Sequence, residues 1–210
     1  LVCTPFNEVI ALDPETGAQL WRFDPKIPTE KVFPANKFNC RGVAVWFEAD
    51  AAKRSGVCGE RVLAATNNEH VIALDLATGK PCADFGANGD VKIDPGMDLN
   101  WPGEFQITSA PVVIGNVVVV GSSISDNARV VAPKGTVRAF DVRTGVAKWS
   151  WDPVPRDSAD RESWSGSIAL PTFRNWRFAT ASNACRPCVW RVRRRFTHGS
   201  LCDLHGNGCC

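Results

Sequence analysis

The chain has 210 residues, a formal net charge of +2 and 44% hydrophobic residues. This composition excludes wholesale disorder, and the near-neutral charge gives no reason to expect a nucleic-acid partner. No run approaches the ~18 consecutive apolar residues of a membrane-spanning helix. The sequence begins with Leu1 and has one methionine, Met97. We therefore expect a globular part of a longer protein.

The composition changes near residue 160. Residues 1–160 carry a net charge of −4 and four cysteines, whereas residues 161–210 carry a net charge of +6, no lysine and five cysteines. The strand-and-turn pattern of the first segment also stops there. The sequence thus predicts a folded segment over residues 1–160 and an aberrant Arg/Cys-rich tail over residues 161–210, out of frame or disordered.

One sequence frame, V-x-A-[LF]-D-x-x-T-G, occurs three times, in VIALDPETGAQLW at 9–21, VIALDLATGKPCA at 71–83 and VRAFDVRTGVAKW at 137–149. The alternation before the aspartate is typical of a strand. Asp-x-x-Thr-Gly is suited to a turn, because the polar side chains bond nearby backbone groups and glycine accepts a positive φ. The frame predicts three equivalent hairpins, with Trp21 and Trp149 on outgoing strands where a large ring can pack between sheets.

Further strands fit between the copies. Residues 42–47 and 61–66 are candidates, and residues 112–122 form a hairpin pattern that turns at Gly115-Asn116. Residues 1–160 show no convincing amphipathic helix. Many short strands, with repeat aspartates 62 and 66 residues apart, favour an all-β fold, a partial β-propeller whose blades have four antiparallel strands. A generic β-sandwich is the alternative.

The repeat with its tryptophan resembles the tryptophan-docking motif of quinoprotein dehydrogenases, eight-bladed propellers that use pyrroloquinoline quinone (PQQ). The membrane-bound glucose and quinate dehydrogenase branch is the more similar one. Four stretches carry this resemblance, CTPFNEVIALDPETGAQLWRFDP, CRGVAVW, TSAPVVIGNVVVVGSSISDN and KGTVRAFDVRTGVAKWSWDPVPRD. Together they cover nearly all of residues 1–160, which would form less than half of such a propeller.

PQQ is a flat tricarboxylate, so its site needs cations, hydroxyls and a divalent metal. The resemblance implies that Arg41 holds a PQQ carboxylate and that Thr108 and Ser123 line the cofactor pocket. It also implies that Asp126 and Asn127 belong to the cofactor-binding residues and that Asp126 is a ligand of Ca²⁺ or Mg²⁺. From the residues alone, Arg41 could equally be a surface salt-bridge residue and Asp126-Asn127 an Asx-rich turn.

Two departures from the family pattern affect the expected activity. Lys37 stands where the glucose branch often has a histidine, which leaves quinate and other polyols open as substrates. The family's catalytic base is an aspartate in a later Pro-Asp loop, and no such loop occurs in this sequence. We therefore expect the chain alone to be inactive.

The four cysteines of residues 1–160 fit an oxidising compartment. They allow three disulfide connectivities. We favour Cys58 with Cys82, since each lies at the edge of a loop that flanks one strand pair, which leaves Cys3 with Cys40. Four buried free thiols are the alternative.

The tail contains a second pattern. Cys185, Cys188, Cys202 and His205 have the spacing of a Cys₃His zinc site, and a basic run at 191–195 is of a kind found in nucleic-acid-binding segments. GC-rich genes that are read out of frame give Arg- and Cys-rich products. We therefore favour a frameshifted or mis-annotated end over a zinc site or a nucleic-acid-binding segment.

Two functional classes fit these patterns. The first is part of a PQQ- and metal-dependent dehydrogenase that oxidises a sugar or polyol and passes electrons to membrane ubiquinone. The resemblance places such an enzyme at the periplasmic face of the bacterial inner membrane, with its anchor outside this chain. The second is a non-catalytic propeller scaffold with related repeats. The presence of Cys-Arg-Gly at 40–42 together with Ser-x-Ser-Asp-Asn at 123–127 favours the enzyme lineage, because a scaffold has no use for them.

Overall fold

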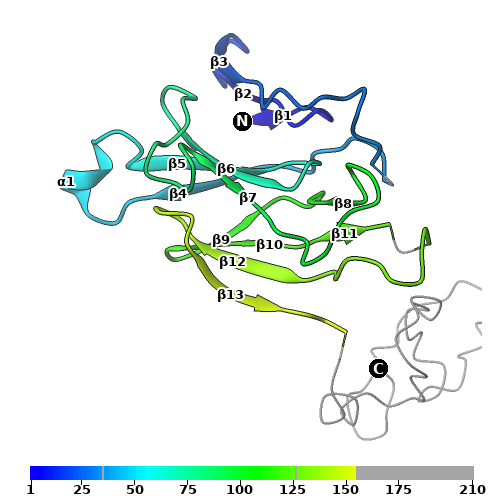
Figure 1. Cartoon of the computed structure of the whole chain (residues 1–210). Helices are drawn as coiled ribbons and strands as arrows, with labels where there is room; N and C mark the ends of the chain where they lie inside the picture. The colour runs from blue at the N-terminus through cyan, green and yellow to red at the C-terminus, as the bar shows by residue number, and fades with distance from the viewer. Residues whose placement is uncertain (35, 126, 155–210) are drawn as a thin grey trace, which may run out of the picture. The chain divides into compact units, whose positions relative to one another are not determined.

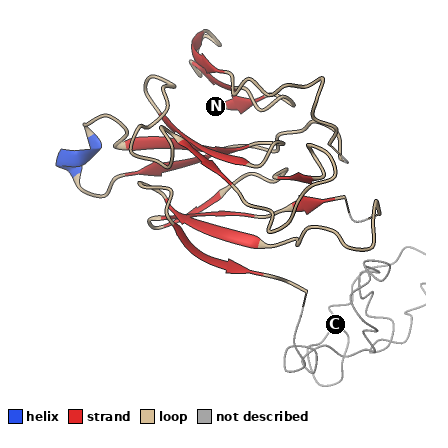
Figure 2. Cartoon of the chain, in the orientation of Figure 1, coloured by secondary structure: helices blue, strands red, loops and turns tan. Residues whose placement is uncertain are grey.

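The computed structural model describes residues 1–34, 36–125 and 127–154. These residues form strands and one short helix (Figures 1 and 2). The elements are β1 (Val2–Cys3), β2 (Val9–Leu12), β3 (Gln19–Phe23), β4 (Ala44–Phe47), α1 (Ala51–Arg54), β5 (Glu60–Ala65), β6 (His70–Asp75), β7 (Asp90–Lys92), β8 (Phe105–Gln106), β9 (Val112–Ile114), β10 (Val117–Val120), β11 (Ser123–Ile124), β12 (Val137–Asp141) and β13 (Ala147–Trp151).

The strands form antiparallel sheets in chain order. The first sheet is β1-β2-β3, the second is β4-β5-β6-β7 and the third is β9-β10-β12-β13, while β8 pairs with β11 in a two-stranded ribbon. Two sheets of four antiparallel strands confirm the predicted all-β fold and blade type. The expected strands near 42–47 and 61–66 correspond to β4 and β5, and the Gly115-Asn116 hairpin joins β9 to β10.

The three repeat turns have the same hydrogen bonds. The carboxylates of Asp13, Asp75 and Asp141 accept bonds from the backbone N–H of the threonine three residues later, at 2.8, 2.9 and 3.1 Å. Each following glycine donates its N–H to the aspartate carbonyl and has a φ of 69–72°. The three predicted hairpin turns are thus equivalent, because the turn is specified within the motif. The first and third copies continue into a paired strand, β3 and β13, whereas after the second turn only Pro81 forms a bridge, to Leu74.

The second sheet is buried on both faces. Val62, Ala64, Ile72 and Leu74 pack with the first sheet, around Val9, Ala11 and Trp21. The alternate residues Leu63, Ala65, Val71 and Ala73 pack with the third sheet and with the β8 segment. Since side chains alternate along a strand, the unbroken apolar runs of β5 and β6 follow from this central place between two neighbours (Figure 1).

Trp21 joins the first sheet to the second. Its indole Nε1 donates a hydrogen bond to the carbonyl of Leu76, at 2.9 Å, and its ring covers Gly79 in the repeat turn of the second sheet. The equivalent turn of the third sheet is contacted by Gly86, whose N–H bonds to the carbonyl of Thr144. The predicted packing between sheets is thus seen for Trp21, whereas Trp149 is 49% exposed.

Ionic contacts join the second and third sheets at the repeat-turn end. Arg61, 3% exposed, donates hydrogen bonds to the carbonyls of Cys58 and Arg143 and pairs with Asp84. Arg143 in turn donates to both carboxylate oxygens of Glu48. The indole of Trp46 lies against both guanidinium groups.

The helix α1 does not contradict the sequence analysis, which found no amphipathic helix. It is only one turn long, in the connection between β4 and β5, and buries none of its side chains. The side chain of Asp50 accepts a hydrogen bond from the N–H of Ala52 and caps it. A helix this short has no amphipathic pattern to detect. No helix among the described residues is both long and apolar enough to span a membrane.

The structure contains the two disulfides that the sequence favoured, Cys3–Cys40 and Cys58–Cys82. The first links β1 to the segment before β4, and the second lies in the buried interface of the second and third sheets. The boundary predicted at residue 160, the tail and its zinc pattern lie outside the described residues and stay predictions.

Candidate functional site

Of the predicted site residues, Arg41, Thr108 and Ser123 lie on segments at one end of the strands, opposite the repeat turns. We call this the Thr66 end, because β5 ends there at Thr66. The residues before β4 and before β9, the β5–β6 turn, and the residues after β10 are all at this end, since each strand runs antiparallel to its neighbour.

Arg41 is exposed and unpaired. It follows the disulfide-bonded Cys40 and precedes β4. Its guanidinium makes no hydrogen bond or ion pair with any residue in the ranges that the structure describes. This cation therefore remains available to a ligand, unlike Arg61 and Arg143, whose guanidinium groups are held by protein partners.

The segments of Arg41 and Thr108 are in contact. A Cβ added to Gly42 would lie 3.3 Å from the Cβ of Ala110, so Cys-Arg-Gly runs directly beside the residues that lead into β9. Thr108 is buried, at 8% exposed. Glycine permits both the close approach and the φ of 141° at position 42.

Ser123 lies beside the same segment. It is paired with Gln106 in the β8–β11 ribbon, two residues before Thr108, and its hydroxyl accepts a hydrogen bond from Asn36 Nδ2 at 2.6 Å. The structure thus brings together the chain segments of Arg41, Thr108 and Ser123. Asn127 lies in an exposed turn after β11, and Asp126 is outside the described residues.

A buried polar network that the sequence did not predict supports these segments. Asn67, Asn7 and Gln106 are 0%, 2% and 1% exposed. Gln106 Nε2 donates to Asn67 Oδ1, at 3.2 Å, and Gln106 Oε1 accepts from the backbone N–H of Asn36. Isolated amides in strand and turn sequences are read as ordinary polar residues, so no sequence signal distinguishes them.

A buried ion pair holds the loop that follows Asn127. Arg129 donates to Glu104 Oε2 at 3.0 Å, and its Nε lies 2.6 Å from Oε1. Glu104 is fully buried, and its backbone carbonyl accepts the N–H of Ser125. A buried carboxylate is stable only when paired and hydrogen-bonded. Glu104 therefore holds both Ser125 and Arg129.

The free groups at the Thr66 end fit an anionic, oxygen-rich ligand. Arg41 supplies an unpaired cation, and Thr108 and Ser123 supply hydroxyls. Two nearby buried atoms, Asn39 Oδ1 and Ser125 Oγ, have no hydrogen-bond partner within the described part of the chain. Buried polar atoms are normally satisfied, so these orphans are consistent with a ligand that completes the site.

Comparison with known proteins assigns the family. The model of the glucose/ethanol/alcohol dehydrogenase β-propeller domain, which uses PQQ, matches residues 1–186. The chain belongs to this PQQ-dependent dehydrogenase family. Its fold is thus part of a quinoprotein β-propeller, and the family implies PQQ as the cofactor. The match extends past residue 160, into the residues for which the sequence predicted a tail.

The relatives of this quinoprotein chain include glucose and quinate/shikimate dehydrogenases. It is 36% identical to quinoprotein glucose dehydrogenase A of Acinetobacter calcoaceticus, over 74% of this chain and 20% of that protein. It is 35% identical to the quinate/shikimate dehydrogenase (quinone) of Acinetobacter baylyi, over 72% of this chain and 20% of that protein. The chain therefore spans about a fifth of the length of these relatives.

A solved structure supports the quinoprotein fold. The quinohemoprotein alcohol dehydrogenase from Comamonas testosteroni matches with a TM-score of 0.56 and 27% identity, over 75% of this chain and 20% of that one. This likeness supports the fold and adds no information on the substrate of this chain.

The described residues contain one cluster with metal-ligand side chains, Cys58, Cys82 and Asp84. Both sulfurs are already bonded to each other, and Asp84 pairs with Arg61. This cluster therefore does not fit the divalent cation that the sequence predicted. The predicted ligand Asp126 lies elsewhere in the chain, beyond the residues described.

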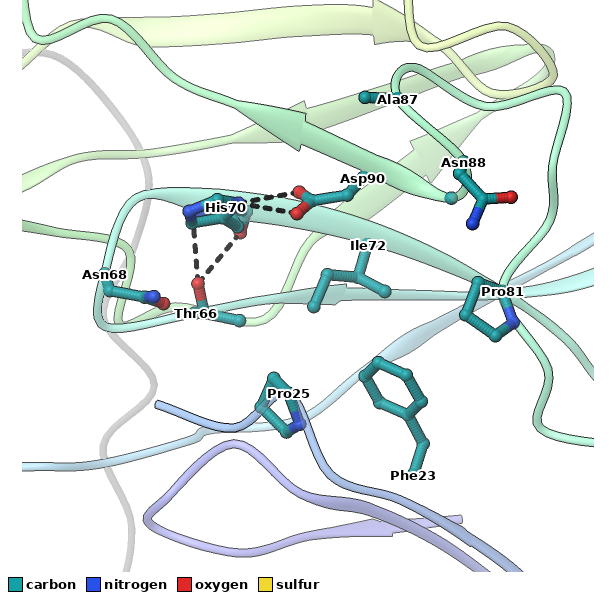
Figure 3. A pocket seen from close by; sticks show the side chains of 11 residues that line it. Phe23, Pro25, Thr66, Asn68, His70, Ile72, Pro81, Ala87, Asn88 and Asp90 are labelled. Carbon is teal, nitrogen blue, oxygen red and sulfur yellow. Dashed lines mark hydrogen bonds and ion pairs between the residues drawn. The ribbon is translucent and has the colours of Figure 1, made fainter. Parts of the chain in front are cut away.

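A separate cavity of about 260 Å³ lies between the first and second sheets. Figure 3 shows His70 and Asp90 on one side and Phe23 and Pro25 on the other. The imidazole Nδ1 of His70 lies 2.8 Å from the Asp90 carboxylate. None of the predicted PQQ residues lines this cavity, so we do not assign it to the cofactor.

Proposed function

We propose that this chain forms part of the cofactor site of a PQQ- and metal-dependent dehydrogenase that oxidises a hydroxyl group of a sugar or polyol, of the glucose or quinate type. The observation that carries the proposal is the contact of the Cys-Arg-Gly segment with the segment of Thr108 at Gly42 and Ala110, beside an arginine with no protein partner among the described residues.

In this proposal Arg41 binds a PQQ carboxylate. A planar guanidinium forms two parallel charge-assisted hydrogen bonds with a carboxylate, which also fixes the ligand's orientation. Thr108 and Ser123 donate or accept hydrogen bonds at further oxygens of the ring system. Asp126 is the proposed ligand of a Ca²⁺ or Mg²⁺ ion, and Asn127 the polar group beside it.

Bound PQQ supplies a two-electron acceptor for the alcohol carbon, and its metal ion polarises the accepting carbonyl. The residues of this chain contribute orientation and electrostatics. A general base must lie within hydrogen-bond reach of the substrate hydroxyl. We propose none among these residues, because the Pro-Asp loop that the family uses for this purpose is absent from the sequence.

The relatives and one departure from the family pattern support the proposed substrate class. Glucose and quinate/shikimate dehydrogenases are both similar to this chain, and glucose and quinate both carry ring hydroxyls. Lys37 replaces the histidine that is frequent in the glucose branch. We therefore favour a ring polyol that can bind beside the positive charge of Lys37. Lys37 is exposed, on the loop that carries Arg41.

We place the protein outside the cytoplasm, at the periplasmic face of the inner membrane, with ubiquinone as electron acceptor. Two disulfides support an oxidising compartment, and the quinate relative is named for its quinone acceptor. Both statements concern the whole protein, of which this chain matches about a fifth by length.

The test is a PQQ titration of the oxidised 210-residue chain with Ca²⁺, followed by calorimetry. We expect saturable binding, and Arg41→Ala weakens it about tenfold or more, the scale of a charge-assisted hydrogen-bond pair. Lys80→Ala is the matched control, because it removes one exposed positive charge beside the repeat turn at 75–79, at the opposite end of the strands.

Two results would contradict the proposal. The first is the absence of saturable PQQ binding, which favours the alternative of a non-catalytic propeller scaffold. The second is an equal loss of affinity in Arg41→Ala and Lys80→Ala, which indicates a general effect of positive charge and not a site at Arg41.

A further inference from the structure

The side chain of Asn67 makes four hydrogen bonds, all to residues far away in the sequence. It follows Thr66 between β5 and β6 and is fully buried. Its Nδ2 group donates to Asn7 Oδ1 at 2.6 Å, to the carbonyl of Pro5 at 3.3 Å and to the carbonyl of Asn39 at 3.1 Å. Its Oδ1 accepts from Gln106.

These bonds join three segments that are far apart in the sequence. Pro5 and Asn7 belong to the β1–β2 turn of the first sheet, Asn39 to the segment before β4, and Gln106 to β8. The partners of Asn67 therefore lie 60, 28 and 39 residues away from it. Asn67 is the residue at which these segments meet.

The carbonyl of Asn39 receives a second bond from the same group of residues. Asn7 Nδ2 donates to it at 3.2 Å, and Asn7 Oδ1 also accepts the backbone N–H of Asn67 at 2.8 Å. The next residue, Cys40, is bonded to Cys3 of the first sheet. The backbone is thus held immediately before Arg41 by two buried amides and a disulfide.

The opposite end of the same loop is also held. Asn36 donates its side-chain amide to Ser123 Oγ and its backbone N–H to Gln106 Oε1. Gln106, on the strand that leads to Thr108, therefore connects the Asn36 end of the loop to Asn67, which itself bonds the Asn39 end. A network of this kind, with its members buried, has one geometry that satisfies all of them, and it rigidifies the segments that it joins.

We propose that Asn67 is a positioning residue for the cofactor site, which orients Arg41 through the Asn39 carbonyl. This inference rests on the proposed function, because Arg41 is taken as the residue that binds the PQQ carboxylate. Asn67 does not touch the ligand. It restrains the backbone next to Arg41. Less conformational entropy is therefore lost when the Arg41 guanidinium binds the ligand.

The first experiment measures PQQ affinity in a double-mutant cycle. Asn67→Ala and Arg41→Ala are made singly and together in the 210-residue chain, and each protein is titrated with PQQ and Ca²⁺. We expect Asn67→Ala to weaken binding about tenfold, and to have no further effect when Arg41 is already alanine. The cycle isolates the coupling of the two residues.

The second experiment does not depend on PQQ. The {¹H}–¹⁵N nuclear Overhauser effect of the Arg41 amide reports how rigidly this backbone is held. We expect it to fall in Asn67→Ala and to be unchanged in Thr78→Ala. Thr78→Ala is the matched control, since it removes two hydrogen bonds in the repeat turn of the same sheet and leaves the loop before β4 alone.

A second variant covers the case in which Asn67→Ala does not fold. Asn7 has a φ of 62°, so Asn7→Gly permits the same backbone geometry while it removes the two hydrogen bonds with Asn67 and the one with Asn39. It should show the same loss of affinity and of order at Arg41. Asn88→Gly, at an exposed residue with a φ of 56°, is the control for added glycine.

Two outcomes would overturn the positioning role. One is that Asn67→Ala weakens PQQ binding by the same factor whether residue 41 is arginine or alanine. The other is that Asn67→Ala leaves the nuclear Overhauser effect of the Arg41 amide unchanged. A third result is that PQQ does not bind the unmodified chain, while Asn67→Ala still lowers the nuclear Overhauser effect of the Arg41 amide. This result would contradict the proposed function, and with it a positioning role toward PQQ.

Discussion

Gly79 lies directly under the indole ring of Trp21. A Cβ at this glycine would be 2.5 Å from Cε3 and 2.6 Å from Cδ2 of the ring. The two residues come from successive copies of the same repeat, and the indole Nε1 is bonded to Leu76 in the same turn. The glycine of the motif therefore has two roles, since it gives the turn its positive φ and leaves room for the tryptophan of the preceding sheet.

The first prediction separates these two roles. Gly17 and Gly79 have the same place in the motif and similar φ values, 72° and 69°, but a Cβ at Gly17 has no atom within 4 Å. We expect Gly17→Ala to lower the free energy of unfolding by about 1 kcal/mol from the left-handed backbone alone. Gly79→Ala should cost a further ~1–3 kcal/mol from overpacking, measured by urea denaturation.

Combining Gly79→Ala with Trp21→Phe tests whether the two residues are in direct contact. The smaller ring should relieve part of the clash, so the double variant should be more stable than the sum of the single effects predicts. Strict additivity of the two changes in unfolding free energy would contradict direct contact between Trp21 and Gly79.

The second prediction concerns acid stability. The hydrogen bonds from Arg143 to Glu48, at 2.7 and 2.9 Å, hold the pKa of the Glu48 carboxyl at about 2, against an ordinary value of 4.5. A lowered pKa in the folded state stabilises the fold above the unfolded-state value and is lost as the proton binds. This stabilisation should thus be complete above pH 4.5 and disappear as the pH falls toward 2.

Glu48→Gln isolates this contribution from those of other carboxylates. We expect the variant to be less stable than the wild type at pH 6, with the difference in urea midpoint shrinking steadily between pH 4.5 and 2. A difference that stays constant over this range would show that the ionised carboxylate of Glu48 does not stabilise the contact between the second and third sheets.

The third prediction concerns the order in which the disulfides are reduced. Cys58 and Cys82 are 4% and 0% exposed, whereas Cys3 and Cys40 are half-buried. A thiolate must reach a sulfur to open the bond, so a mild reductant should open Cys3–Cys40 first. Alkylation and peptide mapping can follow this and separate these cysteines from the five of residues 161–210. Equal rates for the two bonds would contradict it.

The fourth prediction concerns the metal. Asp126→Asn removes a negative charge from the proposed cation ligand. If Asp126 binds Ca²⁺ or Mg²⁺ beside PQQ, the variant should require a much higher cation concentration to reach the same PQQ affinity. Glu30→Gln removes one carboxylate on an exposed residue before β4 and serves as the control. Unchanged metal dependence in Asp126→Asn would exclude this role.

The fifth prediction concerns activity. General-base catalysis requires a base within reach of the substrate hydroxyl, and the sequence contains no Pro-Asp loop. We therefore expect that the 210-residue chain, supplied with PQQ and Ca²⁺ or Mg²⁺, gives no dye-linked oxidation of glucose, quinate or glycerol. Measurable turnover that is lost in Arg41→Ala would show that this chain carries a base of its own, on a residue to which we assign no catalytic role.

The sequence by itself determined the three repeat turns and the sheet type. Asp13, Thr16 and Gly17 form their turn through hydrogen bonds within the motif, so the turn follows from local chemistry. The resemblance to the family likewise follows from the order and the spacing of the sequence motifs along the chain. The sequence also favoured the correct disulfides, although burial and strand positions alone left other pairings open.

The tertiary structure decided what each repeat contacts. Trp21 is buried by the turn of the next sheet, whereas Trp149, at the same motif position, is 49% exposed. The network of Asn67, Asn7 and Gln106 was not predictable, because Asn7 and Gln106 lie 60 and 39 residues away from Asn67 and a buried asparagine has the same sequence signature as a surface one. Only the fold, which brings the loop before Arg41 against two neighbouring sheets, gives these amides their partners.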